Sequence, residues 1–372
     1  MATLHMTKPA TPVAQVNTLT TGRLPKWAPW AILGGSFAVS IAVFALIGGS
    51  SEAGMNWAGA LVVGAIVSIV AQYVLSLVVE GTRQAADRFV TSLVTSAFAL
   101  ALLPLVSLLG TLVANGLARF DATFFSSSMV GVVTQGGGGI HAVVGTLIIT
   151  LIATVISVPI GLFTSIYLVE YGQGGRLGKA ITFFVDVMTG IPSIVAGLFA
   201  YTLIVMLFNA LGLPLTNVRT GFAGALALSV LMIPTVVRSS EEMIRLVPMD
   251  LREASYALGV PKWATIAKIV LPTALAGITT GVMLAIARVI GESAPLLIAA
   301  GYTLYMNYSA FADPMMSLPV FVYRSYTQQV GAGAENMLDL AWTGALVLLL
   351  IVMLLNLLAR LIAKLFAPKG SR

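Results

Sequence analysis

The sequence has no cysteine, only two histidines and few charged side chains, and each shortage excludes a class of protein or site. Without cysteine, neither disulfides nor thiolate metal sites can form. His5 and His141 are isolated from each other, so the sequence offers no metal-ligand spacing. Charged residues make up 9% and apolar residues 58% of the 372 residues. With a mean hydropathy of +0.98, this composition excludes an ordinary soluble globule and indicates an integral membrane protein.

Long apolar runs divide the chain into candidate membrane spans, so we predict an all-α polytopic transmembrane bundle of about eight spans. The predicted spans are 28–49, 57–79, 89–115, 141–169, 191–213, 221–237, 273–300 and 341–361. The first run is longer than the apolar region of a secretory signal peptide, so we interpret it as an uncleaved helix. We expect the sixth helix to continue into 238–245 and a surface helix at 180–190. The glycine and aromatic residues of 116–140 predict an external loop at the membrane interface.

Basic residues cluster in alternate connections, which predicts the orientation of the bundle. Sixteen of the 20 lie in the N-terminal tail, in the segments 80–88, 170–179 and 238–268, and from Arg360 onward. The opposite side has three, and Arg288 lies inside a span. Because cytoplasmic loops carry the excess of Lys and Arg, we expect both termini in the cytoplasm of a multi-pass cell-membrane protein. No fixed-period repeat is visible, which argues against the duplicated halves of many secondary transporters.

The segment 250–272 is polar and stands between two long apolar runs. Asp250 is a candidate N-cap, with Glu253 three positions later, and Gly259 suits a left-handed residue at the helix end. Pro261 then suits the start of a second helix. We therefore predict a helix-turn-helix elbow beside the membrane.

The elbow carries a motif that resembles the EAA signature of bacterial ABC import permeases. The matching residues are Glu253, Ala254, Gly259, Ile269, Leu271 and Pro272, with Ser255 in place of the usual second alanine. Stretches such as SLVTSAFALALLPLV, IPTVVRSSEEMIRLVPMDLREASYALG and LAIARVIGESAPLL are similar to the PstA family of phosphate-importer permease subunits. The similarity covers about 92–361.

This resemblance implies a type I ABC importer permease core with two additional N-terminal helices. The expected parts are a tail at 1–27, an added transmembrane hairpin at 28–88, the first family helix and an external loop at 89–140, the permease domain at 141–361, and a second tail at 362–372. The function implied is the permease subunit of an ATP-driven phosphate importer that works by alternating access. The implied partners are a PstC-like second permease, two PstB-like ATPase subunits and a PstS-like phosphate-binding protein.

The resemblance also implies that the first elbow helix docks on the ATPase subunit and transmits closure of the ATPase dimer to the membrane helices. The residues expected to do so are Glu253, Ala254, Ser255, Gly259 and Pro261. Small side chains at Ala254 and Ser255 would permit close approach to another protein, Glu253 would satisfy the helix start, and Gly259 would permit the turn.

The chain itself offers no credible ATP site. The segment GQGGRLGKA, 172–180, resembles a Walker loop, but Gln173 stands at the first required glycine and Ala180 follows the lysine. No nucleophile with a matched base is visible, so we expect no catalysis and no cofactor, with ATP bound by a partner chain.

Arg288 and Glu292 are the two charges placed centrally in a predicted span, four positions apart and so on one helical face. A charge at that depth costs roughly 2.5 to 3.5 kcal/mol on insertion scales, so both should face protein or water. Either they form a structural salt bridge, or they line the substrate path, with Arg288 offering a guanidinium fork to an oxyanion. The resemblance favours the path. Ser293 and Ser193 would add hydroxyl donors, although lone serines more often serve helix packing.

Other classes of function remain open from the sequence alone. A permease for sulfate or molybdate would use the same guanidinium fork. An ion-coupled secondary transporter would need charged residues in several spans, and a membrane enzyme would need a reactive cluster. Asp186 and Arg238 match family stretches, but we interpret them as residues that anchor helices at the interface.

Overall fold

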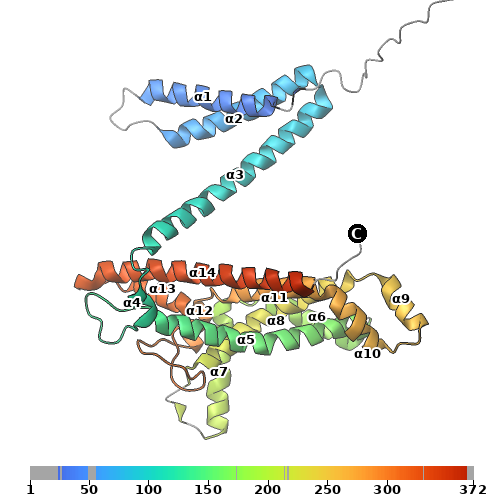
Figure 1. Cartoon of the computed structure of the whole chain (residues 1–372), viewed down its shortest axis with the longest axis vertical. Helices are drawn as coiled ribbons and strands as arrows, with labels where there is room; N and C mark the ends of the chain where they lie inside the picture. The colour runs from blue at the N-terminus through green and yellow to red at the C-terminus, as the bar shows by residue number, and fades with distance from the viewer. Residues whose placement is uncertain are drawn as a thin grey trace, which may run out of the picture. The chain divides into compact units, whose positions relative to one another are not determined.

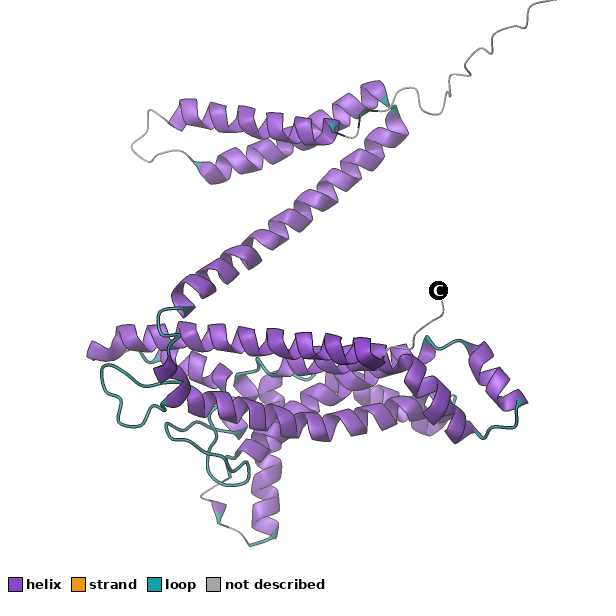
Figure 2. Cartoon of the chain, in the orientation of Figure 1, coloured by secondary structure: helices purple, strands orange, loops and turns teal. Residues whose placement is uncertain are grey.

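The computed structural model describes residues 24–25, 27–48, 56–172, 174–212, 214–215, 218–329 and 331–366, with side chains up to residue 361. Within these residues the regular elements are helical and no strand is present (Figure 2). Among the described residues, eight helices are long and apolar enough to cross a membrane. The predicted all-α polytopic bundle is therefore confirmed. Most of the predicted N-terminal tail, the first interhelical turn and the end of the C-terminal tail lie outside the described residues.

The chain divides into two compact units, residues 1–109 and 110–372, and the division falls inside one long helix. The elements labelled in Figure 1 follow in chain order. They are α1 (Ala28–Gly48), α2 (Trp57–Val79), α3 (Thr82–Gly116), α4 (Ala122–Ser126), α5 (Ile140–Ile166), α6 (Arg176–Thr189), α7 (Ser193–Ala210), α8 (Gly221–Arg245), α9 (Met249–Ala257), α10 (Lys262–Thr265), α11 (Leu271–Val289), α12 (Ala294–Ala299), α13 (Leu318–Thr327) and α14 (Ala334–Phe366). Two π-helical turns, Tyr167–Tyr171 and Ile266–Val270, continue α5 and precede α11.

In the first unit, α1 and α2 pack as a hairpin through small residues spaced four apart on α2. A Cβ built on Gly64 would lie 2.8 Å from the Phe37 ring, and the Ser40 hydroxyl donates to the Ala60 carbonyl at 2.6 Å. Small residues let apolar helices approach closely and exchange hydrogen bonds within a membrane.

Glu80 lies between α2 and α3 and connects parts of the first unit. Its side chain is 2% exposed and accepts hydrogen bonds from Arg88, Ser76 and the backbone of Leu24. Burial raises the pKa of Glu80, but these bonds outweigh it and lower the pKa to about 2. The predicted loop at 80–88 is wrong, because α3 already begins at Thr82 with residues that are mostly good helix formers.

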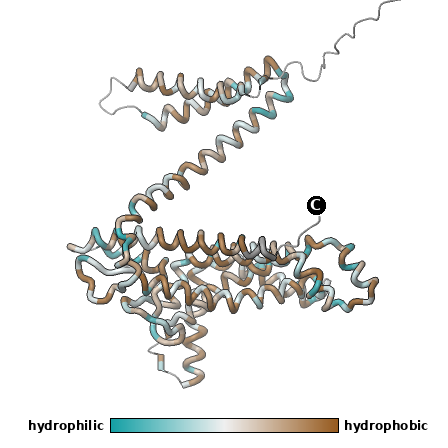
Figure 3. The backbone as a smooth tube through the Cα atoms, in the orientation of Figure 1, coloured by the Kyte–Doolittle hydropathy of each residue, from teal (hydrophilic) through white to brown (hydrophobic). Residues whose placement is uncertain are grey.

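The second unit is a bundle in which α5, α8, α11 and α14 lie side by side (Figure 1). Hydrophobic residues run along these long helices (Figure 3). Glycines permit the closest approaches: a Cβ built on Gly161 would lie 2.6 Å from the Val236 side chain, and one on Gly281 would lie 2.5 Å from Ser239. The helices α9 and α10 stand at one end of this bundle, called the elbow end below. The sixth helix continues to Arg245, as expected.

The seventh predicted span is wrong as a continuous helix. The helix α11 ends at Val289, and α12 begins only at Ala294. Gly291 has no side chain to favour a helix, and Pro295 lacks an N–H and restrains the residue before it, so this stretch does not continue α11. A second interruption, 190–192, separates α6 from α7. The helices that follow the two interruptions pack closely, since a Cβ built on Gly197 of α7 would lie 2.7 Å from the Pro295 Cα of α12.

The end of the bundle opposite the elbow contains more structure than predicted. Within the segment 301–338, α13 forms a helix and α14 begins at Ala334. In the segment 116–140, Phe120 and Phe125 are exposed, but Phe124 is fully buried. The prediction of an interfacial position is therefore wrong for Phe124, because Gly139 leaves room for its ring.

Candidate functional site

The predicted elbow is present, and its turn has the expected geometry. Gly259 has φ +75°, a left-handed conformation that glycine adopts without strain. Pro261 occupies the N-cap position of α10. We predicted Asp250 as the N-cap of α9, and this is wrong. Pro248 takes that position, and the helix begins at Met249. Asp250 instead lies in the first turn, where a carboxylate interacts favourably with the helix dipole.

The helix α9 has an inner and an outer face. Ser255 is buried on the inner face, and its hydroxyl lies 2.8 Å from that of Thr265 in α10. Its predicted close approach to another protein is therefore wrong, because the spacing of three from buried Arg252 places it toward its own chain. Glu253 and Ala254 are exposed on the outer face.

Large apolar side chains extend this outer face. Leu251 and Tyr256 are exposed on α9, Leu258 follows it with 83% of its surface exposed, and Trp263 of α10 is exposed as well. Contiguous apolar surface of this kind marks an interaction site. The two faces of α9 therefore differ: the inner one packs within the chain, and the outer one leaves large apolar side chains exposed.

Arg252 and Glu170 connect the elbow to two helices of the bundle. The Arg252 guanidinium donates to the carbonyls of Ile244 at 2.9 Å and Val247 at 3.0 Å, in and just after the last turn of α8. Its Nη2 also lies 3.1 Å from Glu170 Oε1, in the π-helical turn after α5. Lys262 of α10 donates to the Glu170 carbonyl oxygen and lies over the Tyr171 ring.

The sequence reasoning missed this network. Glu170 follows directly after an apolar run and Arg252 precedes Glu253, so each charge was visible. Nothing in the local spacing indicated that two residues so distant in the chain would meet.

The predicted pathway residues lie at the interruption between α11 and α12. Arg288 is in the last turn of α11, whereas Glu292 lies beyond the end of that helix. They therefore do not share one helical face, and that prediction is wrong. Within the described part of the chain, neither side chain has a hydrogen-bond or ion-pair partner. The salt-bridge interpretation thus has no support in the structure.

The depth of Arg288 follows from the packing of α11 on α8. Gly281 faces Ser239, which is six positions before the end of α8 at Arg245. Arg288 lies seven residues further along α11, or about 10 Å at 1.5 Å per residue. This places Arg288 level with the middle of α8, although it lies in the last turn of its own helix and not, as we had expected, near the middle of a continuous span.

The two candidate serines lie at the starts of the helices that meet at this level. Ser193 begins α7, and Ser293 immediately precedes α12. Both are half-buried. Non-helical backbone at membrane depth is tolerated where it is buried in protein or lines a water-filled cavity. A guanidinium and a hydroxyl are each donors suited to an anion.

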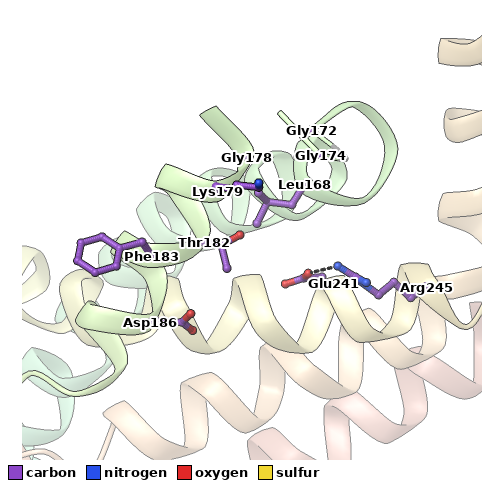
Figure 4. A pocket seen from close by; sticks show the side chains of 10 residues that line it. All are labelled: Leu168, Gly172, Gly174, Gly178, Lys179, Thr182, Phe183, Asp186, Glu241 and Arg245. Atoms are coloured by element: carbon purple, nitrogen blue, oxygen red, sulfur yellow. Dashed lines mark hydrogen bonds and ion pairs between the residues drawn. The ribbon is translucent and has the colours of Figure 1, made fainter. Parts of the chain in front are cut away.

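A separate pocket of about 520 Å³ lies at the elbow end between α6 and α8 (Figure 4). Arg238 forms ion pairs with Asp186 of α6 and, at 2.9 Å, with Glu241, which also pairs with Arg245 at 2.6 Å. The Asp186 and Arg238 pair agrees with their interpretation as helix anchors. The Walker-like segment contributes glycines and Lys179 to this pocket, but its charged lining is balanced, two basic and two acidic side chains, so it offers no net positive charge to a polyphosphate. The described residues include no group of three potential metal ligands.

Comparisons with known proteins match this arrangement. The family described as "Binding-protein-dependent transport system inner membrane component" matches residues 157–372. The chain is 45% identical over 273 residues, 73% of its length and 86% of the relative's, to "Phosphate transport system permease protein PstA 1" of Mycobacterium tuberculosis. It is 38% identical over 248 residues, 67% of its length and 80% of the relative's, to "Phosphate transport system permease protein PstA" of Yersinia pestis.

A solved structure shares the fold. A chain of a bacterial alginate ABC transporter, in complex with a periplasmic protein bound to an alginate pentasaccharide, superposes with a TM-score of 0.55. The sequences are 16% identical, and the match covers 77% of this chain and 97% of the other. This similarity concerns the fold alone.

Proposed function

Since the chain belongs to the PstA family of phosphate transport system permease proteins, we infer that it is the membrane-spanning permease subunit of an ATP-driven phosphate importer. The observation that carries this conclusion is the 45% identity over 273 residues, which spans most of both chains. The chain is a multi-pass membrane protein and a transport subunit rather than an enzyme.

We propose that it works with a PstC-like second permease, two PstB-like ATPase subunits and a PstS-like phosphate-binding protein. The outer face of α9 supports the ATPase contact, because it presents Glu253 and Ala254 among exposed apolar side chains. ATP hydrolysis belongs to the partner, since the Walker-like segment lacks two of the residues that the motif requires. The excess of basic residues at the elbow end supports a cytoplasmic elbow and cytoplasmic termini.

The mechanism that we propose is alternating access. ATP binding closes the ATPase dimer and draws α9 with it, so that the bundle opens to the binding protein, and hydrolysis returns it to the inward-facing state. Phosphate passes the interruption between α11 and α12. There Arg288 offers a bidentate donor set that stays charged at all physiological pH values, while Glu292, Ser293 and Ser193 line the same level.

Another oxyanion, such as sulfate or molybdate, would fit the same donor groups, and the sequence identity to phosphate permeases is what favours phosphate. An ion-coupled secondary transporter is not favoured, since the elbow would have no role in it.

Reconstitution tests the proposal. Vesicles containing this chain with the second permease and the ATPase should accumulate labelled phosphate, delivered on the binding protein, only when ATP is supplied. Accumulation without ATP, or none with ATP and all partners present, would contradict it.

A further inference from the structure

The ion pair between Glu170 and Arg252 is more deeply buried than any pathway residue. The side chains are 6% and 7% exposed, and burying two charges costs much of what their attraction returns. An apolar pair would hold the elbow as well or better, so stability alone does not explain these charges. They call for a role that depends on where the pair lies.

The pair lies where three elements meet. Arg252 belongs to α9 and also binds the carbonyls that end α8, while Glu170 belongs to the π-helical turn that ends α5. Lys262 holds the same turn from α10. Any displacement of α9 must therefore either carry the ends of α5 and α8 with it or break this pair.

The contact is an ion pair without a matched fork of hydrogen bonds. Glu170 Oε1 and Arg252 Nε have no hydrogen-bond partner among the described residues, although Oε1 lies 3.1 Å from Nη2. Two parallel hydrogen bonds would fix the angle between the groups. A single charged contact still keeps the two ends together, which is what the transmission of a displacement requires.

We propose that the Glu170 and Arg252 pair is the joint that carries movement of the elbow into α5 and α8. The helix α8 packs against Gly277 and Gly281 of α11. The movement therefore passes from α8 to α11 and reaches the level of Arg288. This inference rests on the proposed function, since only a chain driven by an ATPase has an elbow that is moved. Glu170 and Arg252 are then positioning residues that contact neither ATP nor phosphate.

Neutral variants in the complete reconstituted transporter test the joint. Glu170→Gln or Arg252→Gln alone leaves one buried charge unpaired, so each should lower the amount of assembled complex. The double variant leaves no unpaired charge and should restore assembly and ATPase activity, but phosphate moved per ATP hydrolysed should fall about tenfold, a typical size for coupling between sites. Arg245→Gln is the matched control: it removes an exposed guanidinium at the same end, while Arg238 still pairs with the buried Glu241, so it should leave the ratio unchanged.

A double variant with the wild-type ratio would overturn the joint and leave only a structural role. The wild type in the same vesicles separates this failure from that of the proposed function. If the wild type moves no phosphate with ATP, the proposed function fails; if it does and the double variant matches it, only the joint fails.

A distance measurement requires no change at the pair and does not depend on the transported anion. The chain has no cysteine, so Leu258→Cys beside α9 and Phe163→Cys on α5, both exposed, give it two unique label sites. Because Leu258 extends the outer face of α9, recovery of the ATPase with the labelled chain must first match that of the unlabelled wild type. Spin labels there should keep one distance with and without ATP, because α9 and the end of α5 move together. A distance that changes with ATP in the otherwise wild-type chain would overturn the proposal.

Discussion

Arg288 and Glu292 lie four positions apart, yet α11 ends between them and their side chains form no ion pair. The guanidinium is exposed near the middle of the neighbouring α8. An uncompensated charge at such a depth is costly in lipid, so it must face water, a partner chain or the anion. A role in the path therefore explains Arg288 better than a structural bridge does.

Arg288→Gln should reduce phosphate uptake at least about tenfold with little loss of assembled complex, since hydrogen bonds to charged groups contribute roughly 1.5 to 3 kcal/mol. Arg288→Lys should retain only part of the wild-type phosphate uptake, because an ammonium lacks the bidentate fork of the guanidinium. Uptake and membrane abundance measured together are the test. The exchanged protein, Arg288→Glu with Glu292→Arg, should stay inactive, and full transport by it would show that a bridge is all that matters.

Gly259→Val should uncouple the transporter. A β-branched residue at φ +75° is strained by about 1 to 2 kcal/mol or more, which would misdirect α9. Both uptake and recovery of the ATPase with this chain should fall while membrane abundance stays normal. Gly259→Asn is the control, because asparagine tolerates the left-handed region. Normal uptake and normal ATPase recovery in Gly259→Val would refute the coupling role of the elbow.

Gly145→Ala should destabilise the bundle by about 1 to 3 kcal/mol. A Cβ there would lie 1.9 Å from the Met316 carbonyl oxygen, a backbone atom that cannot swing aside. Thermal unfolding in detergent measures the effect. Gly110→Ala, which meets nothing within 4 Å, should not lower the melting temperature, and equal losses in the two variants would contradict the packing described.

Because of Glu80, the first unit should lose stability as the pH falls. Its pKa falls from 4.5 to about 2 in the folded chain, so its stabilisation is complete above about pH 4.5 and is lost as the pH falls toward 2. Glu80→Gln should be less stable than the wild type at pH 7, and the difference should shrink between pH 5 and pH 3. Melting curves at these pH values would contradict the account if the difference stayed constant.

The sequence predicted the features that local chemistry determines. Gly259 and Pro261 indicated the elbow turn, and continuous apolar runs indicated eight crossing helices. The break before α12 was not predicted, although Gly291, Glu292, Ser293 and Pro295 interrupt the apolar run, because the apolar residues on both sides together match the length of one span. The spacing of residues along the sequence could not reveal Glu170 and Arg252 as partners either, because their contact forms only when α5, α8 and α9 pack together.

The first 88 residues should be dispensable for transport, since the resemblance to phosphate permeases begins only after them. This stays a prediction. Loss of uptake by a truncated chain that still inserts and assembles would show that α1 and α2 belong to the working core.

The most direct test of the central claim is uptake of labelled phosphate by cells that lack this chain and then regain it, with excess unlabelled sulfate or molybdate as competitors. The account predicts that uptake returns with the chain and that neither competitor reduces it. Uptake that stays absent, or that sulfate or molybdate suppresses as strongly as unlabelled phosphate does, would contradict a phosphate permease.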